Sequence, residues 1–223
     1  MEELEPLEDA FIDDDDDNFG GAKRSRPGYE KEIIARAVEA AHELKNCDNK
    51  TTSATTLPAG AGTFLNTLMN AIDQGTTGSS RTGREYIIER IEFNTQVVSS
   101  TVDAFRWLLV WDKEPRGAAF MYPDLFAIAS AGGGVYSYID FDNANRFKIV
   151  YDSGPTVVSP TVSGINGQKC SSGRIKLGWK VRCYTTTGNQ IQDIDSGSLY
   201  FIGVSGSGAA TINYGIRVLF RDI

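Results

Sequence analysis

The chain has 223 residues, of which 41% are hydrophobic, so it is long enough for one well-filled domain with an additional tail. No stretch approaches the roughly 20 apolar residues of a membrane-spanning helix, so we expect no membrane segment. Glu2, Glu3 and Glu5 stand where a secretory signal requires positive charge, and we therefore expect no secretion by that route.

The formal net charge of −7 is unevenly distributed along the chain. Residues 1–60 contain 7 Lys or Arg and 15 Asp or Glu, a net charge of −8, whereas residues 61–223 contain 15 and 14, a net charge of +1. Three cysteines without C-x-x-C spacing, Cys47, Cys170 and Cys183, favour neither a zinc site nor a set of disulfides. We expect reduced thiols and no obligatory cofactor.

The first segment, residues 1–26, is predicted to be a disordered acidic arm. Asp13 to Asp17 is an unbroken aspartate run, and like charges at this density oppose a compact state. A small basic cluster follows, Lys23, Arg24 and Arg26, and its charge makes it a candidate nucleic-acid contact.

Residues 27–50 are predicted to form an amphipathic helix. Pro27 suits the first turn, and apolar residues then recur three and four positions apart up to Leu44. The helical pattern itself ends near Asn46, and the remaining residues to 50 complete the segment. Two roles fit such a helix: packing on its own subunit, or bundling with symmetry-related copies.

Residues 51–62 have no periodicity and are predicted to be a linker, so the folded domain is expected to span 63–223. Short runs rich in Val, Ile, Phe and Tyr alternate there with turn residues, without a helical pattern long enough for a crossover, which predicts an all-β antiparallel sandwich or barrel. The expected strands are Phe64–Ile72, Tyr86–Val98, Phe105–Trp111, Arg146–Tyr151, Arg174–Tyr184, Leu199–Val204 and Ile212–Phe220, with a short helix or turn over Pro123–Ser130.

One predicted strand carries a cationic stripe roughly 30 Å long, at about 3.3 Å per residue. Because side chains alternate along a strand, four basic residues share one face while Ile175, Leu177, Trp179 and Val181 share the other. The basic residues are Arg174, Lys176, Lys180 and Arg182. They are either the soluble face of a half-buried strand or a contact for nucleic acid or an acidic neighbour.

Five segments, in order, resemble those of a known family. Phe105-Arg-Trp-Leu-Leu-Val-Trp-Asp-Lys-Glu-Pro-Arg-Gly117 is similar to an aliphatic strand followed by a W-D-K-x-P-x-G turn. The later segments are Pro123–Phe126, Asn145–Asp152, Ser198–Val204 and Gly215–Asp222. Together they resemble the single jelly-roll coat proteins of geminivirus-like circular single-stranded DNA viruses and of satellite tobacco necrosis virus.

The resemblance implies an eight-stranded antiparallel jelly-roll sandwich of two four-stranded sheets, with a disordered and helical N-terminal arm. It also implies a capsid protein that self-assembles into a small icosahedral shell of roughly sixty copies around a single-stranded genome, DNA rather than RNA. The expected location is the virion, with assembly in the host nucleus or cytoplasm, and with a host receptor that the sequence does not identify.

The acidic arm departs from the basic arm that the resemblance implies, because aspartates repel phosphates. The acidic segment could lie outside the shell or in an axis channel, it could shield the basic cluster until genome displaces it, or the inner sheet surface could hold the genome instead. We favour the second, because acid and base lie only a few residues apart.

Catalysis is not indicated by the sequence. The single histidine, His42, falls in the predicted arm helix, and Glu89 and Glu92 are expected on opposite faces of a strand, as ordinary surface charges. Asp140, Asp142 and Asp152 are candidate ligands for a structural calcium ion or solvated loop acids. The alternative to a coat protein is a jelly-roll binding module, for carbohydrate or a receptor, that forms at most a small oligomer.

Overall fold

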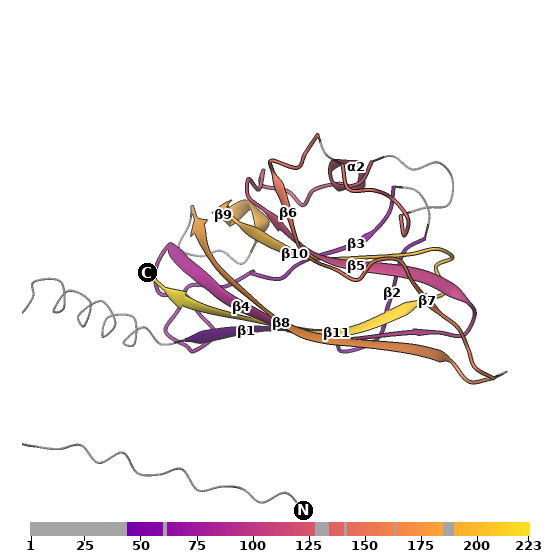
Figure 1. The fold of residues 1–223 in the computed structure, drawn as a ribbon. Helices are drawn as coiled ribbons and strands as arrows, with labels where there is room; N and C mark the ends of the chain where they lie inside the picture. The colour runs from indigo at the N-terminus through magenta and orange to yellow at the C-terminus, as the bar shows by residue number, and fades with distance from the viewer. Residues whose placement is uncertain (1–43, 60–61, 128–133, 141, 163, 185–189) are drawn as a thin grey trace, which may run out of the picture. The chain divides into compact units, whose positions relative to one another are not determined.

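Antiparallel strands, rather than helices, build the domain. The computed structural model describes residues 44–59, 62–127, 134–140, 142–162, 164–184 and 190–223 (Figure 1). These residues form two curled antiparallel sheets with little helix, which confirms the all-β prediction. The compact unit that contains both sheets spans His42–Ile223.

The six-stranded sheet has the order β1-β11-β4-β8-β9, with β2 paired to β11, and the five-stranded sheet has the order β3-β10-β5-β6, with β7 paired to β5. The strands of the first sheet are β1 (Lys45–Lys50), β2 (Thr55–Thr56), β4 (Glu85–Ser99), β8 (Gly167–Cys183), β9 (Ile194–Ser196) and β11 (Thr211–Asp222). Those of the second are β3 (Leu65–Leu68), β5 (Asp103–Asp112), β6 (Phe147–Asp152), β7 (Thr156–Val158) and β10 (Ser198–Ser205).

The described residues therefore form eleven strands instead of the expected eight. All seven predicted strands are present, although β3 is shorter than its apolar run. The strands not predicted are β1, β2, β7 and β9. They are short. Strands β1, β2 and β7 pair with longer strands far away in the sequence, a tertiary contribution that the local pattern does not contain, whereas β9 pairs with the end of β8, the preceding strand.

The boundary between arm and domain was predicted too late in the chain. The end of the expected helix, at residues 45–50, is strand β1, which pairs along its whole length with β11. The expected linker contains β2 and the fully buried Leu57, whose N–H donates to the carbonyl of Ala210. Cross-strand partners on β11 override the local sequence in both places. Residues 27–43 of the predicted helix lie outside the described residues.

The core lies between the two sheets and is rich in aromatic side chains. Trp107 stacks on Phe201 and Tyr151, with ring centroids 5.6 and 4.5 Å apart, and meets Phe93 edge to face at 5.2 Å. Trp107 is only 1% exposed, and burial of a side chain of this size contributes about 2–3 kcal/mol.

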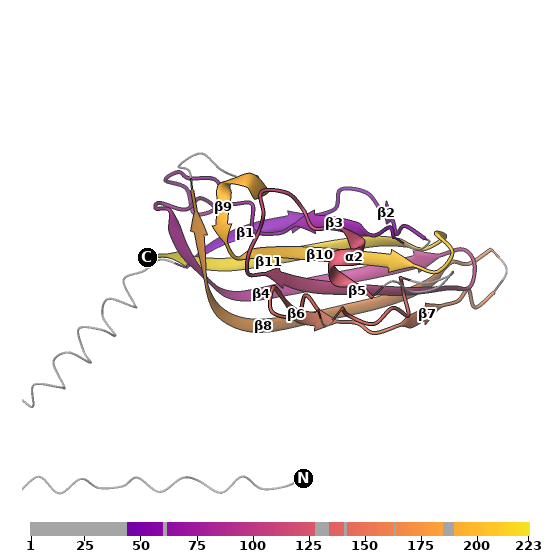
Figure 2. The ribbon, with the colours of Figure 1, turned by 90° about the horizontal axis from the view of Figure 1, so that it is seen from above.

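A second apolar cluster covers the outer face of the five-stranded sheet. The connection between β5 and β6 includes helix α2 (Tyr122–Leu125) and packs Phe120, Tyr122 and Phe126 against Leu108, Tyr200 and Ile202. As a result, β5 and β10 are buried on both faces. The α2 segment lies on one side of the sandwich, whereas β1, β4, β8 and β11 form the opposite layer (Figures 1 and 2).

Candidate functional site on the outer face of the six-stranded sheet

The predicted cationic stripe lies on the outer face of the six-stranded sheet, along β8. Burial alternates strictly there, with Arg174, Lys176, Lys180 and Arg182 exposed and the intervening residues turned toward the core. The two-face prediction for this strand is confirmed. On β11, Ile216, Val218 and Phe220 are likewise buried, whereas Arg217 is exposed.

Three of the four stripe residues are paired with carboxylates on neighbouring strands. The guanidinium Nε of Arg174 lies 2.9 Å from Glu92, Lys180 Nζ lies 2.8 Å from Glu85, and Arg182 Nε lies 3.4 Å from Asp195. Opposite charges facing each other across strands stabilise a particular register. Within the described part of the chain, Lys176 is the stripe residue with no carboxylate within 4.0 Å.

A β-bulge in β4 places an additional carboxylate on this face. Leu219 and Phe220 of β11 pair with Arg90 and Ile88, so Glu89 is an extra residue relative to β11 and the side-chain alternation of β4 changes phase. On the other side, Glu89 lies opposite two residues of β8, Leu177 and Gly178. Glu89 accepts a hydrogen bond from Arg221 at 2.5 Å on the outer face. The prediction that Glu89 and Glu92 lie on opposite faces is therefore wrong, because simple alternation does not allow for a bulge.

The charges continue onto β11 and β1. Arg217 donates two hydrogen bonds to Asp48, at 2.7 and 2.8 Å, and these bonds lower the pKa of the Asp48 carboxyl and raise the pKa of Arg217. Because Arg217 lies opposite Glu92, and Glu92 opposite Arg174, charge alternates in sign across four strands in a single row. We call this part of the outer face, from the Arg174 row to the Arg182 row, the charged half.

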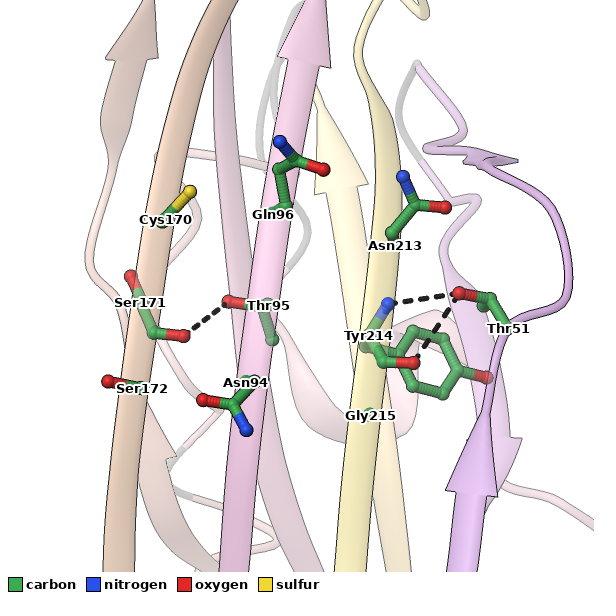
Figure 3. Close-up of a pocket in the computed structure, with 10 residues that line it drawn as sticks. All are labelled: Thr51, Asn94, Thr95, Gln96, Cys170, Ser171, Ser172, Asn213, Tyr214 and Gly215. Carbon is green, nitrogen blue, oxygen red and sulfur yellow. Dashed lines mark hydrogen bonds between the residues drawn. The ribbon is translucent and has the colours of Figure 1, made fainter.

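Beyond the charged half, the outer face carries an exposed cation on its β1 edge, Lys50, opposite Gly215. Its remaining side chains on β11, β4 and β8 are polar without charge and line a shallow hollow of about 590 Å³. The lining residues are Thr51, Asn94, Thr95, Gln96, Cys170, Ser171, Ser172, Asn213, Tyr214 and Gly215. Figure 3 shows the side chains of Asn94, Gln96 and Asn213 on adjacent strands. Thr51 closes one side, since its hydroxyl accepts a hydrogen bond from the N–H of Tyr214 at 3.0 Å. We call this surface the polar hollow.

The amides of the polar hollow define what it can bind. The side-chain amide of Gln96 donates a hydrogen bond to Gln168 at 3.0 Å, whereas the side chains of Asn94 and Asn213 make no hydrogen bond to another described residue. An amide offers both donors and acceptors, which suit hydroxyl groups, base edges or peptide groups and do not select for charge. This surface was not predicted from the sequence, because its residues lie on three strands and at Thr51, and the sequence does not give the register that brings them together.

The three calcium candidates do not form one site. Both carboxylate oxygens of Asp152 accept hydrogen bonds from Arg106, at 2.9 and 2.5 Å, whereas Asp140 accepts from the N–H of Asp142 in a local turn. No group of three or more His, Cys, Asp or Glu side chains in the described residues is arranged to hold a metal ion.

Several other predicted features lie outside the described residues. These are the acidic run Asp13–Asp17, the basic cluster Lys23, Arg24 and Arg26, and His42. Among the helices that the structure does describe, none is long and apolar enough to cross a membrane. The chain matches no protein-family model and no curated protein.

Proposed function

We propose that this chain is a viral coat protein with a jelly-roll fold, which self-assembles into a small icosahedral shell around a single-stranded genome. In this proposal the protein acts by assembly rather than catalysis, resides in the virion, and assembles in the host nucleus or cytoplasm. Single-stranded DNA and a shell of roughly sixty copies follow from the family resemblance.

The nested order of strand pairing is the observation that carries the proposal. Eight principal strands pair from the outside inward along the chain, β1 with β11, β3 with β10, β4 with β8, and β5 with β6. This is the connectivity of one long antiparallel hairpin rolled into two sheets, as in a jelly roll. The short strands β2, β7 and β9 extend this arrangement without changing it.

The difference between the two outer faces supports a role in a wall. The β5–β6 connection covers the outer face of the five-stranded sheet, whereas the outer face of the six-stranded sheet bears the charged half and the polar hollow. A shell subunit separates an interior from an exterior and needs two chemically different faces.

The polar hollow favours a second candidate, a jelly-roll module that binds a carbohydrate or another hydroxyl-rich ligand. Its free amides suit such a ligand, but the ring of Tyr214 stacks on Phe201, at 4.5 Å, so it is not presented to a sugar in the hollow. This module would remain a monomer or a small oligomer.

The two functions are separated by expressing the full chain and examining its assembly. Sedimentation velocity and negative-stain microscopy over a range of salt and pH should show closed particles of uniform size, and the ratio of absorbance at 260 and 280 nm reports packaged nucleic acid. A chain that stays small under all these conditions, and is retained on an immobilised glycan, would exclude the shell and favour the binding module.

The charged half is the proposed genome contact within the domain, and Lys176 is its most available cation. Lys176→Gln should lower affinity for a single-stranded oligonucleotide and reduce the slope of log K against log salt by about 0.7. The thermal midpoint should not change, because Lys176 is not ion-paired to a described residue. Lys113→Gln, on the β5–β6 connection, is the control. Equal effects of the two variants would contradict binding at the charged half.

A further inference from the structure

Charged residues are absent from several long stretches of the sequence, among them residues 51–72, 93–102, 153–168 and 196–216. The fold brings parts of these stretches to one end of the sandwich. The N–H of Gly206 donates to the carbonyl of Ala104 at 2.7 Å, the N–H of Ser205 donates to Pro58 at 2.9 Å, and Ser99 pairs with Gly167. In Figures 1 and 2 this end, near the labels β2 and β7, lies opposite the end marked C.

We call this region the uncharged end and define it by its described loops. These are 55–59, 99–102, 156–162 with 164–168, and 205–210. The carboxylate of Asp103 adjoins it but is only 3% exposed, and it accepts hydrogen bonds from Ser205, Ser207 and Ala210 at 2.9–3.0 Å. The carboxylate that adjoins these loops in sequence is thus directed into the protein, and the loops themselves contain no charged residue. The first exposed cation after them is Lys169, in β8.

Four large aliphatic side chains are exposed at the uncharged end. Val102 is 66% exposed, Val157 58%, Val162 60% and Ile165 58%. They come from two neighbouring segments, because Asp103 pairs with Val158 and Ala104 with Val157. Protein surfaces normally intersperse charge, and the core of a protein–protein contact is depleted of it. An aliphatic surface without charge is therefore typical of a surface that becomes covered.

We infer that the uncharged end is a contact surface for further copies of this chain. Copies related by a symmetry axis present the same surface to the contact, so any net charge on it would face charge of the same sign. The absence of charge removes that repulsion. Nucleic acid would require cations on this end, and a membrane surface is usually bound through Lys, Arg and Trp, none of which these loops contain.

The inference rests on the proposed function for the expectation of a closed shell, but contact between copies through this end can be tested separately. The variant Val157→Lys/Val162→Lys and the variant Val157→Glu/Val162→Glu should each weaken self-association about tenfold or more, because like charges then meet. An equimolar mixture of the two should associate more strongly than either alone, since opposite charges can meet. A folding defect would not be rescued by mixing.

The control is Tyr138→Lys, which places the same charge on a side chain that is 82% exposed in the β5–β6 connection. Sedimentation velocity measures association, and circular dichroism confirms that each variant is folded. Shells that form equally well from wild type and both charged variants would overturn the inference and leave the proposed function standing. If the wild type forms only small oligomers and the variants dissociate, the inference stands and the proposed shell function is overturned. A wild-type chain that remains monomeric would overturn both the inference and the proposed function.

Discussion

At the scale of single residues, the domain contains two kinds of arginine–carboxylate pair with the same geometry and different surroundings. Arg146 donates to both oxygens of Asp112 at 2.9 and 2.7 Å, and Asp112 is fully buried. Arg217 and Asp48 form an equivalent pair, but their side chains are 49% and 46% exposed. Burial therefore decides how much each ion pair contributes to the stability of the fold, because solvent screens the attraction within the exposed pair.

Asp112→Asn should destabilise the domain by about 3 kcal/mol, since it leaves the buried Arg146 guanidinium without a counter-charge. Urea unfolding followed by tryptophan fluorescence measures the loss. Asp48→Asn is the matched control and should shift the midpoint far less. Equal shifts in the two variants would show that burial does not govern the strength of these pairs.

The Asp103 carboxyl predicts part of the pH dependence of stability. Burial alone would raise its pKa, but hydrogen bonds from Ser207, Ser205 and Ala210 outweigh burial and hold the pKa below its usual value. A carboxyl whose pKa is lower in the folded state stabilises the protein above the unfolded pKa of about 3.9, and this stabilisation is lost as the pH falls through the folded pKa.

Asp103→Asn should therefore be less stable than wild type at pH 7, and the difference should shrink as the pH falls below about 4. Urea unfolding at several pH values provides the measurement. A difference that stays constant from pH 7 to pH 3 would mean that the ionised carboxylate is not the stabilising species.

At the scale of elements, the long strands could be predicted from sequence because each carries its own alternating pattern. The apolar runs from Tyr86 and Phe105 lie within a residue or two of strands β4 and β5. Strand β1 has no such pattern, because its six residues are mostly polar and it owes its conformation to pairing with β11. The same holds for Thr55–Thr56, where two residues cannot display a period.

The bulge and the polar hollow were not predictable for a related reason. Both depend on which residues of three strands lie opposite one another, and sequence alone does not give that register. The cationic stripe was predictable because it lies on one strand. Its ion pairs were not, since Glu92 is brought to Arg174 only by the pairing of β4 with β8.

Two glycines on the outer face of the six-stranded sheet differ in backbone conformation, which gives a prediction about the strands. Gly178, in β8 beside the bulge of β4, has φ +67°, whereas Gly215, in β11, is not in the positive-φ region. A Cβ added at either position would meet no atom within 4 Å. The two glycines are therefore alike in having space for a side chain, and they differ in the backbone dihedral angle φ.

Gly178→Ala should cost about 1 kcal/mol, because an L-residue is strained at positive φ, whereas Gly215→Ala should be neutral or slightly stabilising. The difference between their thermal midpoints measures this contribution. If Gly178→Ala were as well tolerated as Gly215→Ala, the positive φ at the bulge would not be required for the pairing of β8 with β4.

At the scale of the whole molecule, charge is separated both along the chain and across the domain. Residues 1–60 carry a net charge of −8, whereas the outer face of the six-stranded sheet holds Arg174, Lys176, Lys180 and Arg182. If the chain packages nucleic acid as proposed, the cations attract the phosphates and the acidic residues repel them, so the two regions make opposite contributions to genome binding. In the proposed coat protein, the affinity for nucleic acid therefore depends on both the acidic residues and the cationic stripe, and not on the stripe alone.

Deletion of residues 2–17 tests this balance. The deleted segment contains ten carboxylates and no basic residue, so the formal net charge changes from −7 to +3. The truncated chain should bind single-stranded oligonucleotide more tightly, with the largest gain at low salt, and its particles should show a higher ratio of absorbance at 260 to 280 nm. Replacing Asp13–Asp17 with asparagine is the control for chain length, and it should produce part of the same gain. Unchanged nucleic-acid content in both variants would show that the acidic segment does not oppose packaging, and would favour its placement outside the shell or in an axis channel.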